Sequence, residues 1–273
     1  MDPRLQKRVQ RYGWDRSSAH YEAHWASQLE PVQKRMLEIA ALQPGERVLD
    51  TACGTGLVTF PAAEAVGSGG SVVATDISDE MVKTLRELTT EQGTENVSAE
   101  RMDAEELKLD DETFDVALCA LGLMYYPEPI TAFKEMRRVL RPGGRVAVGV
   151  WGARDNCGWA EIFPIVDTRV STEVCPLFFQ LGTGDALVHT MKAADLVDIE
   201  IDRISTTLHY DSAETARGAV FSGGPVAMAY SRFDEKTRDE VHAEYLASIE
   251  SFRKDQSYEL PGEFVIGMAR RPK

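Results

Sequence analysis

The strongest constraint on the fold of this chain lies at residues 48–56 (VLDTACGTG), where an apolar strand pattern runs into a turn spaced by glycines. Glycine has no side chain, so a ligand can lie directly against the backbone at Gly54 and Gly56. A second apolar run at residues 71–76 ends in Asp76, twenty positions after Gly56. A carboxylate at that position suits the two hydroxyls of a ribose. The pattern therefore predicts an α/β domain that binds a nucleoside.

Details of this turn narrow the choice of nucleoside. A dinucleotide-binding turn carries another glycine three residues after its second, and here that position is Thr59. No lysine follows the turn, which excludes a P-loop. Asp50, at the end of the first strand, would repel a pyrophosphate but attract an ammonium group. The turn therefore favours S-adenosylmethionine, with its methionine ammonium, over NAD.

Hydrophobic periodicity predicts strands and helices that alternate along the chain. Strands are expected at 46–51, 71–76, 97–102, 114–119, 145–151, 197–209 and 263–270, with helices at 57–66, 78–92, 129–140 and 183–194. Such βαβα alternation implies a parallel sheet with helices on both faces. Upstream, residues 17–42 are predicted to be helical and broken in two at Pro31. Downstream, residues 152–182 read as irregular, and residues 212–254 as two helices divided at 223–225 (GGP).

Five motifs in order resemble those of the class I S-adenosylmethionine-dependent methyltransferases. The resemblance is strongest to the small-molecule branch that includes the ubiquinone/menaquinone-biosynthesis enzymes. The motifs are residues 48–56, 75–81 (TDISDEM), 102–107 (MDAEEL), 114–127 and 140–145 (LRPGGR). The resemblance covers about residues 45–151. It implies a seven-stranded, mostly parallel Rossmann-like sheet whose last strand runs antiparallel between strands five and six.

The same resemblance suggests how the rest of the chain is organised. Residues 1–44 are expected to form an N-terminal helical lid over the cofactor, and residues 45–273 the Rossmann-like core. Ligands of such sheets bind at the carboxyl edge of the strands. The segments at 152–182 and 212–254 are then insertions at that edge, where they would cap the substrate.

The methionine and ribose parts of S-adenosylmethionine have four candidate contacts. Gly54 and Gly56 would let the backbone approach the methionine half, and Asp50 would hold its ammonium. Asp76 would accept hydrogen bonds from both ribose hydroxyls. Structural roles are the alternatives: a helix start for Gly56, a strand-end cap for Asp50 and a helix cap for Asp76, although Ser78 suits that last role better.

The adenine and the sulfonium have further candidate contacts. Ile77 and Met81 would sandwich the adenine, although packing in the core accounts for Met81 equally well. Asp103 would accept a hydrogen bond from the exocyclic amine, and the amide of Ala104 would serve a ring nitrogen. Three more residues complete the set: Cys119, whose main-chain carbonyl would lie near the sulfonium, Ala52, and Tyr21, in the segment that would fold over the cofactor. For Tyr21, which shares a helix face with Trp25, the alternative is a purely structural anchor.

No general base stands out in the sequence. Many members of the resembled family carry His or Asn just after strand four, but here that loop is 121–127 (LGLMYYP). Tyr125 is therefore the candidate catalytic residue, as a substrate contact in that loop. The candidate walls of the substrate pocket are aromatic or amide side chains: Trp25, Tyr126, Trp151, Asn156 and Trp159.

The resemblance implies transfer of a methyl group from S-adenosylmethionine to a small, partly hydrophobic acceptor, leaving S-adenosylhomocysteine. Three alternatives stay open. The fold could serve a non-methylating, cyclase-like reaction, or the chain could be a non-catalytic cofactor-binding regulatory subunit. The third alternative is a methyltransferase for a soft metalloid such as arsenite, which would be bound by the converging thiols of Cys119, Cys157 and Cys175. Their spacing is not diagnostic, and no metal site is predicted.

Bulk properties limit the partners. A net charge of −14 argues against binding a nucleic-acid backbone. The sequence contains no 18-residue apolar run for a membrane span and no secretory signal pattern at its start. Its four cysteines, without a Cys-x-x-Cys pair, fit reduced thiols. We therefore expect a cytoplasmic protein with a small-molecule partner, and a homodimer stays open.

Overall fold

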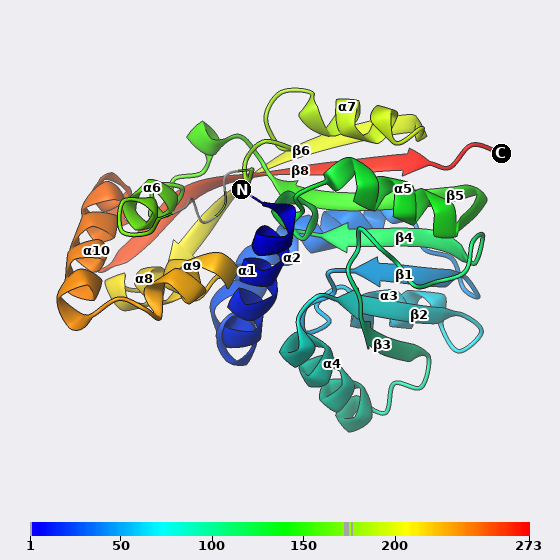
Figure 1. Ribbon diagram of the computed structural model, residues 1–273, viewed down its shortest axis with the longest axis horizontal. Helices are drawn as coiled ribbons and strands as arrows, with labels where there is room; N and C mark the ends of the chain where they lie inside the picture. Colours follow the sequence, from blue (N-terminus) through cyan, green and yellow to red (C-terminus); the bar gives the residue numbers. More distant parts are fainter. Residues whose placement is uncertain (1, 172–174, 176) are drawn as a thin grey trace.

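A sheet of strand order β3-β2-β1-β4-β5-β8-β6 organises the chain in the computed structural model, which describes residues 2–171, 175 and 177–273 (Figure 1). Strands β1 to β5 pair with one another in parallel, and β6 runs in the same direction because it and β5 are both antiparallel to β8. The last strand, β8, runs antiparallel between β5 and β6, as expected. The strands are β1 Arg47–Thr51, β2 Ser71–Asp76, β3 Val97–Arg101, β4 Phe114–Ala120, β5 Leu140–Trp151, β6 Val197–Tyr210 and β8 Ser257–Arg270. A two-residue strand, β7 (Arg253–Lys254), pairs with β8 and makes the sheet eight-stranded rather than seven-stranded.

Helices cover both faces of the sheet, as the alternation predicts. A Cβ at Gly149 of β5 would lie 2.7 Å from Val32 of α2, whereas one at Gly267 of β8 would lie 2.6 Å from Met191 of α7. Gly149 pairs with Ile266, so Gly149 and Gly267 face opposite sides. Helices α2 and α7 therefore pack on opposite faces. The helices of this part are α2 Tyr21–Ala40, α3 Thr59–Val66, α4 Asp79–Gln92, α5 Pro129–Val139 and α7 Ala186–Ala193.

The prediction of a break at Pro31 is wrong. Helix α2 runs without interruption from Tyr21 to Ala40 with Pro31 inside it. A proline removes one backbone hydrogen bond from a helix interior. Here the apolar stripe of α2 outweighs that cost, because Leu29, Val32 and Met36 are buried against the sheet.

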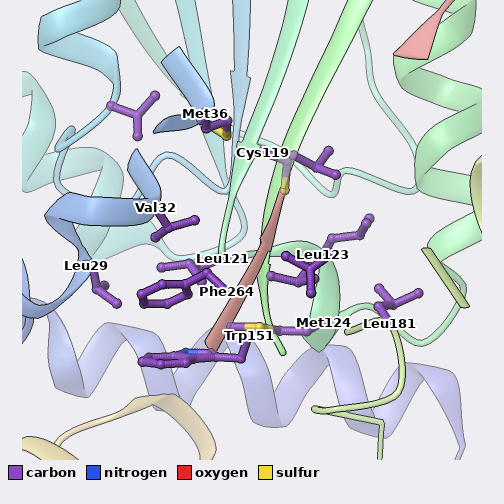
Figure 2. Close-up of a cluster of buried hydrophobic side chains, with 14 of the residues drawn as sticks. Leu29, Val32, Met36, Cys119, Leu121, Leu123, Met124, Trp151, Leu181 and Phe264 are labelled. Atoms are coloured by element: carbon purple, nitrogen blue, oxygen red, sulfur yellow. The ribbon is translucent and has the colours of Figure 1, made fainter. Parts of the chain in front are cut away.

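The apolar core beneath α2 is shown in Figure 2. Leu29, Val32 and Met36 lie over the sheet, and Trp151 of β5 lies beside Phe264 of β8. The ring centroids of Trp151 and Phe264 are 4.2 Å apart. This packing fixes the carboxyl end of β5, from which the chain leaves the sheet.

Helix α1 (Pro3–Ser17) lies in the segment expected to be helical from the family resemblance, although hydrophobic periodicity did not predict a helix there. The Asp2 side chain caps it by accepting a hydrogen bond from the Arg4 amide, and Pro3 occupies its first turn. Its buried residues are polar or small, namely Gln6, Gln10, Gly13 and Ser17. An apolar stripe, which is the usual sign of a packed helix, is therefore missing.

A group of short helices gathers at one end of β6 and β8, both of which extend into it from the sheet (Figure 1). These helices are α6 Ile162–Asp167, α8 Ala213–Phe221, α9 Gly224–Tyr230 and α10 Glu235–Ser248. Residues 212–254 thus hold three helices instead of the two predicted. The chain does divide at the predicted place, because α8 ends at Phe221 and Gly223 precedes α9, with Gly224 and Pro225 in the first turn of α9. The additional helix is α10. No helix in the described part of the chain is long and apolar enough to cross a membrane.

Candidate functional site

The carboxyl ends of β1 and β4 meet at the point where the strand order reverses, and the backbone there is strained. Ala52 and Leu121 follow these strands with φ angles of 53° and 61°. Residues other than glycine rarely adopt such positive φ angles, because each one costs on the order of 1–3 kcal/mol. A Cβ at Gly122 would lie only 2.3 Å from that of Ala52. The two strand ends therefore approach closely, and both strained residues line a cavity.

This first cavity lies along the ends of β1, β2 and β4 and beneath α1. Its lining includes most of the residues expected to bind the cofactor: Tyr21, Ala52, Gly54, Asp76, Ile77, Met81, Asp103 and Ala104. Tyr125 and Tyr126 line it from the loop after β4. The structure thus brings together side chains that lie between residues 21 and 126 of the sequence.

Asp76 joins the ends of β2 and β1 at the floor of the first cavity. Its Oδ2 accepts a hydrogen bond from the Gly54 amide and its Oδ1 one from the Ser78 amide, both at 2.9 Å. Burial is the main cause that raises the pKa of Asp76 to about 6. Ser78 itself caps α4 by accepting from the Met81 amide. Each oxygen of Asp76 keeps a second lone pair for a ligand donor.

Asp50 lies deeper, at the end of β1. Its Oδ2 accepts a hydrogen bond from the Thr59 hydroxyl at 2.6 Å, and its buried Oδ1 has no partner among the described residues. Burial raises the pKa of Asp50 to about 7. A small recess beside it is walled by Tyr21, Gln33, Gly54 and Ala120. An unpaired, buried carboxylate oxygen beside a recess suits a cationic ligand group.

Helix α1 supplies residues to the first cavity that sequence reasoning missed. Lys7, Gln10 and Trp14 line it from above, at a spacing that places them along one helix face. The Lys7 ammonium lies 2.6 Å from Asp103 Oδ2 and 2.7 Å from Glu105 Oε2. The expected adenine contact Asp103 is therefore already ion-paired to α1. The sequence did carry a signal for this helix face: Lys7 precedes Gln10 by three residues and Trp14 by seven.

Three expected cofactor contacts do not line the first cavity: Asp50, which borders the recess described above, Gly56 and Cys119. Gly56 (φ 105°) is buried in packing, because a Cβ there would lie 2.5 Å from Leu85 and 2.8 Å from Phe60. Crowding in the core therefore accounts for the glycine here, a reason that differs from the helix start considered as the alternative. The side chain of Cys119 is fully buried, with its Sγ 3.7 Å from the Tyr126 hydroxyl.

A second cavity adjoins the first and is largely aromatic. Trp25, Trp151 and Trp159 line it, as expected of a substrate pocket, together with side chains from the two insertions. Trp14, Tyr21, Leu121 and Tyr125 line both cavities and so form the wall between them.

Two of the expected pocket residues lie elsewhere. Asn156 is exposed, in the short turn Arg154–Asn156, and does not line the second cavity. Tyr126 lines the first cavity instead of the second.

The cysteines do not form a metalloid site. Cys119 and Cys157 are buried and Cys175 is half-buried beside the second cavity. Among residues 2–171, 175 and 177–273, no group of three or more His, Cys, Asp or Glu side chains could hold a metal ion. The convergence considered for an arsenite-type reaction is therefore wrong.

Comparison with known proteins agrees with this geometry. Residues 48–144 match the family described as "Methyltransferase domain". The aklanonic acid methyltransferase DauC of Streptomyces sp. (strain C5) is 36% identical over 49% of this chain and 61% of its own length. The nocamycin O-methyltransferase of Saccharothrix syringae is 28% identical over 77% and 80%. The ubiquinone/menaquinone biosynthesis C-methyltransferase UbiE of Ectopseudomonas mendocina (strain ymp) is 39% identical over 55% and 57%.

A solved structure shares the fold. A candidate methyltransferase (BH2331) from Bacillus halodurans C-125 superposes with a TM-score of 0.64 at 21% identity, covering 88% of this chain and 99% of its own. Residues 48–144 thus match a methyltransferase domain, and the chain is similar to small-molecule methyltransferases over a longer stretch. Its matches to DauC and UbiE span only about three fifths of those relatives' lengths.

The protonation of Asp50 generates a prediction about stability. Between the ordinary carboxyl pKa of 3.8 and about 7, the folded protein keeps a proton on Asp50 that the unfolded chain has lost. This residue therefore makes the free energy of unfolding fall as pH rises through that range. In Asp50→Asn the fall should be smaller, so the variant gains stability relative to the native protein as pH rises. Urea unfolding from pH 4 to 8, with the exposed Asp110→Asn as control, measures this; a constant difference would contradict it.

Proposed function

We propose that this protein transfers the methyl group of S-adenosylmethionine to a small, partly hydrophobic organic acceptor. One observation carries the proposal: two buried carboxylates, the unpaired Asp50 Oδ1 and the amide-held Asp76, flank the bare backbone of Gly54. Together they offer a place for a cation and a place for a pair of hydroxyls. Similarity to small-molecule C- and O-methyltransferases supports the same reaction class.

The residues of the first cavity and of the recess beside Asp50 fit this cofactor part by part. Asp50 would hold the methionine ammonium and Asp76 the ribose hydroxyls, with the Gly54 backbone between them. Ile77 and Met81 would lie against the adenine, near Asp103 and the Ala104 amide. When bound, the cofactor supplies a methyl group on a positively charged sulfur, which is a strong electrophile.

The protein's own part is to align the acceptor and exclude water. Proper alignment alone can supply about 7–11 kcal/mol of a barrier. The wall shared by the two cavities is where the methyl would cross, and Tyr125 lies in it. Burial raises the pKa of Tyr125 well above its usual range, so its hydroxyl stays protonated. We therefore assign Tyr125 the role of a hydrogen-bond donor that orients the acceptor, and not that of a base.

Residues 1–44 act in this proposal as a lid, of which α1 is the moving part. Lys7, Gln10 and Trp14 cover the first cavity. Two further contacts fasten α1 to α4: the ion pair of Arg11 with Asp79, and the hydrogen bond from Ser78 to Asp15. Entry and exit of the cofactor then require these contacts to open. The insertions at 152–182 and 212–254 cap the acceptor side.

Two further assignments concern the binding partners of the protein and its location in the cell. A small-molecule acceptor and no nucleic acid fit the acidic charge. Four cysteines without a disulfide fit a reducing cytoplasm.

The ribose assignment is tested at Asp76. Asp76→Ala should raise the dissociation constant for S-adenosylmethionine at least about tenfold, because a charge-assisted hydrogen bond contributes about 1.5–3 kcal/mol. Calorimetry measures the affinity, and urea unfolding checks that the variant folds. Asp110→Ala, at an exposed position, is the control. Unchanged affinity in folded Asp76→Ala would reject the assignment.

The lid is tested at Lys7, whose two ion pairs are partly shielded from solvent. Lys7→Met should speed dissociation of S-adenosylhomocysteine about three- to tenfold, since each such pair contributes up to about 1 kcal/mol. Trypsin should also cleave more readily within residues 4–16. Stopped-flow release and timed proteolysis measure these effects, and Lys34→Met on the exposed side of α2 is the matched control. Equal release rates in both variants would show that α1 does not gate the cavity.

A further inference from the structure

The second cavity is walled by rings that meet at steep angles. The rings of Trp151 and Trp159 are 4.9 Å apart at 64°, and Trp25 approaches both of them. Phe163 and Phe178 extend the same wall, with centroids 4.8 Å apart. Flat rings set in this way leave slots that accept another flat ring, edge to face or offset. The shape of the wall therefore favours a planar ring system over a flexible chain.

The described part of this wall carries no charged side chain. Among the described residues that line the second cavity, none is Asp, Glu, Lys, Arg or His. An ammonium group there would meet no carboxylate, and a carboxylate would meet no cationic side chain. Burying an unpaired charge costs far more than burying a neutral polar group. A cationic acceptor would also be repelled by the positive sulfur on the cofactor side.

Neutral hydrogen-bonding groups collect at one place. Tyr21 and Tyr125 belong to the wall between the cavities, and Cys175 lines the second cavity near Tyr125. Burial raises the pKa of all three side chains, so each keeps its proton at neutral pH. Such groups donate to a hydroxyl or carbonyl oxygen and accept from a hydroxyl. They lie where the methyl would cross, so an oxygen of the acceptor is expected there.

We propose that the acceptor is an uncharged, planar ring compound, methylated on a hydroxyl oxygen or on a ring carbon activated by that hydroxyl. This inference rests on the proposed methyl transfer. An electron pair of that oxygen or carbon forms the new bond to the methyl carbon, and the carbon–sulfur bond breaks with its pair staying on sulfur. The proton of the hydroxyl, or of the ring carbon, leaves to water. Amines and carboxylates are disfavoured as acceptors.

Three probes with the same ring system test the charge preference. They are 2-naphthol, which is protonated at pH 7, 2-naphthoate and 2-naphthylmethylammonium. Quenching of tryptophan fluorescence reports binding to the native protein, with and without S-adenosylhomocysteine. We expect 2-naphthol to bind at least about tenfold more tightly than either charged probe. Equal or tighter binding of a charged probe would overturn the inference.

Two neighbouring phenylalanines provide matched variants. Phe178 lines the second cavity, whereas Phe179 packs beside it without lining the cavity. Phe178→Leu should weaken 2-naphthol binding severalfold and leave the affinity for S-adenosylhomocysteine unchanged, while Phe179→Leu should change neither. Equal losses in both variants would show that the probe binds elsewhere and would overturn the inference.

Glu173 lies outside the described residues and is close in sequence to Cys175, so it has a test of its own. Glu173→Gln should leave the ranking of the three probes unchanged. If the native protein binds the ammonium probe and Glu173→Gln does not, an acidic side chain serves the acceptor side, and the inference is overturned. Binding of S-adenosylhomocysteine, measured separately, distinguishes the two proposals. Its absence would remove the proposed function, whereas its presence with a preference for charged probes would remove only the acceptor class.

Discussion

The structure depends on one carboxylate, Asp76, which holds together the ends of two strands. By accepting the amides of Gly54 and Ser78 at 2.9 Å, it fixes the glycine turn after β1 against the start of α4. The strained backbone at Ala52 and Leu121 then faces the same cavity. Without this clamp, the bare backbone that the ligand needs would not be presented to the cavity.

Two buried carboxylates in one small region are costly for the unliganded protein. The pKa values of Asp50 and Asp76 are raised to about 7 and about 6, mainly by burial, and Asp76 adds to the shift of Asp50. Strained backbone and half-paired polar atoms are typical of functional sites, where a ligand completes the interactions. A cationic ligand would relieve this cost and stabilise the fold on binding. The acceptor side has the opposite character, with rings and neutral hydroxyls.

The sheet was predictable because its signals are local. The glycine turn, the carboxylates at the strand ends and the apolar runs are short patterns, and most of the residues they single out line one cavity in the structure. The lid was harder to predict, since α1 buries Gln6, Gln10 and Gly13 and carries no apolar stripe. Contacts between distant segments, such as Lys7 with Asp103, leave no local trace. Asn156 and Gly56 were misplaced because the direction of a loop and the crowding by Leu85 are set by tertiary packing.

The central claim is that a cationic nucleoside lies across Gly54, held by one carboxylate at each end. A crystal structure of the protein with S-adenosylhomocysteine tests it most directly. The account predicts the amino group within hydrogen-bond distance of Asp50 Oδ1, and both ribose hydroxyls on Asp76. Electron density with the ribose away from Asp76, or with side chains filling the space beside Gly54, would contradict it.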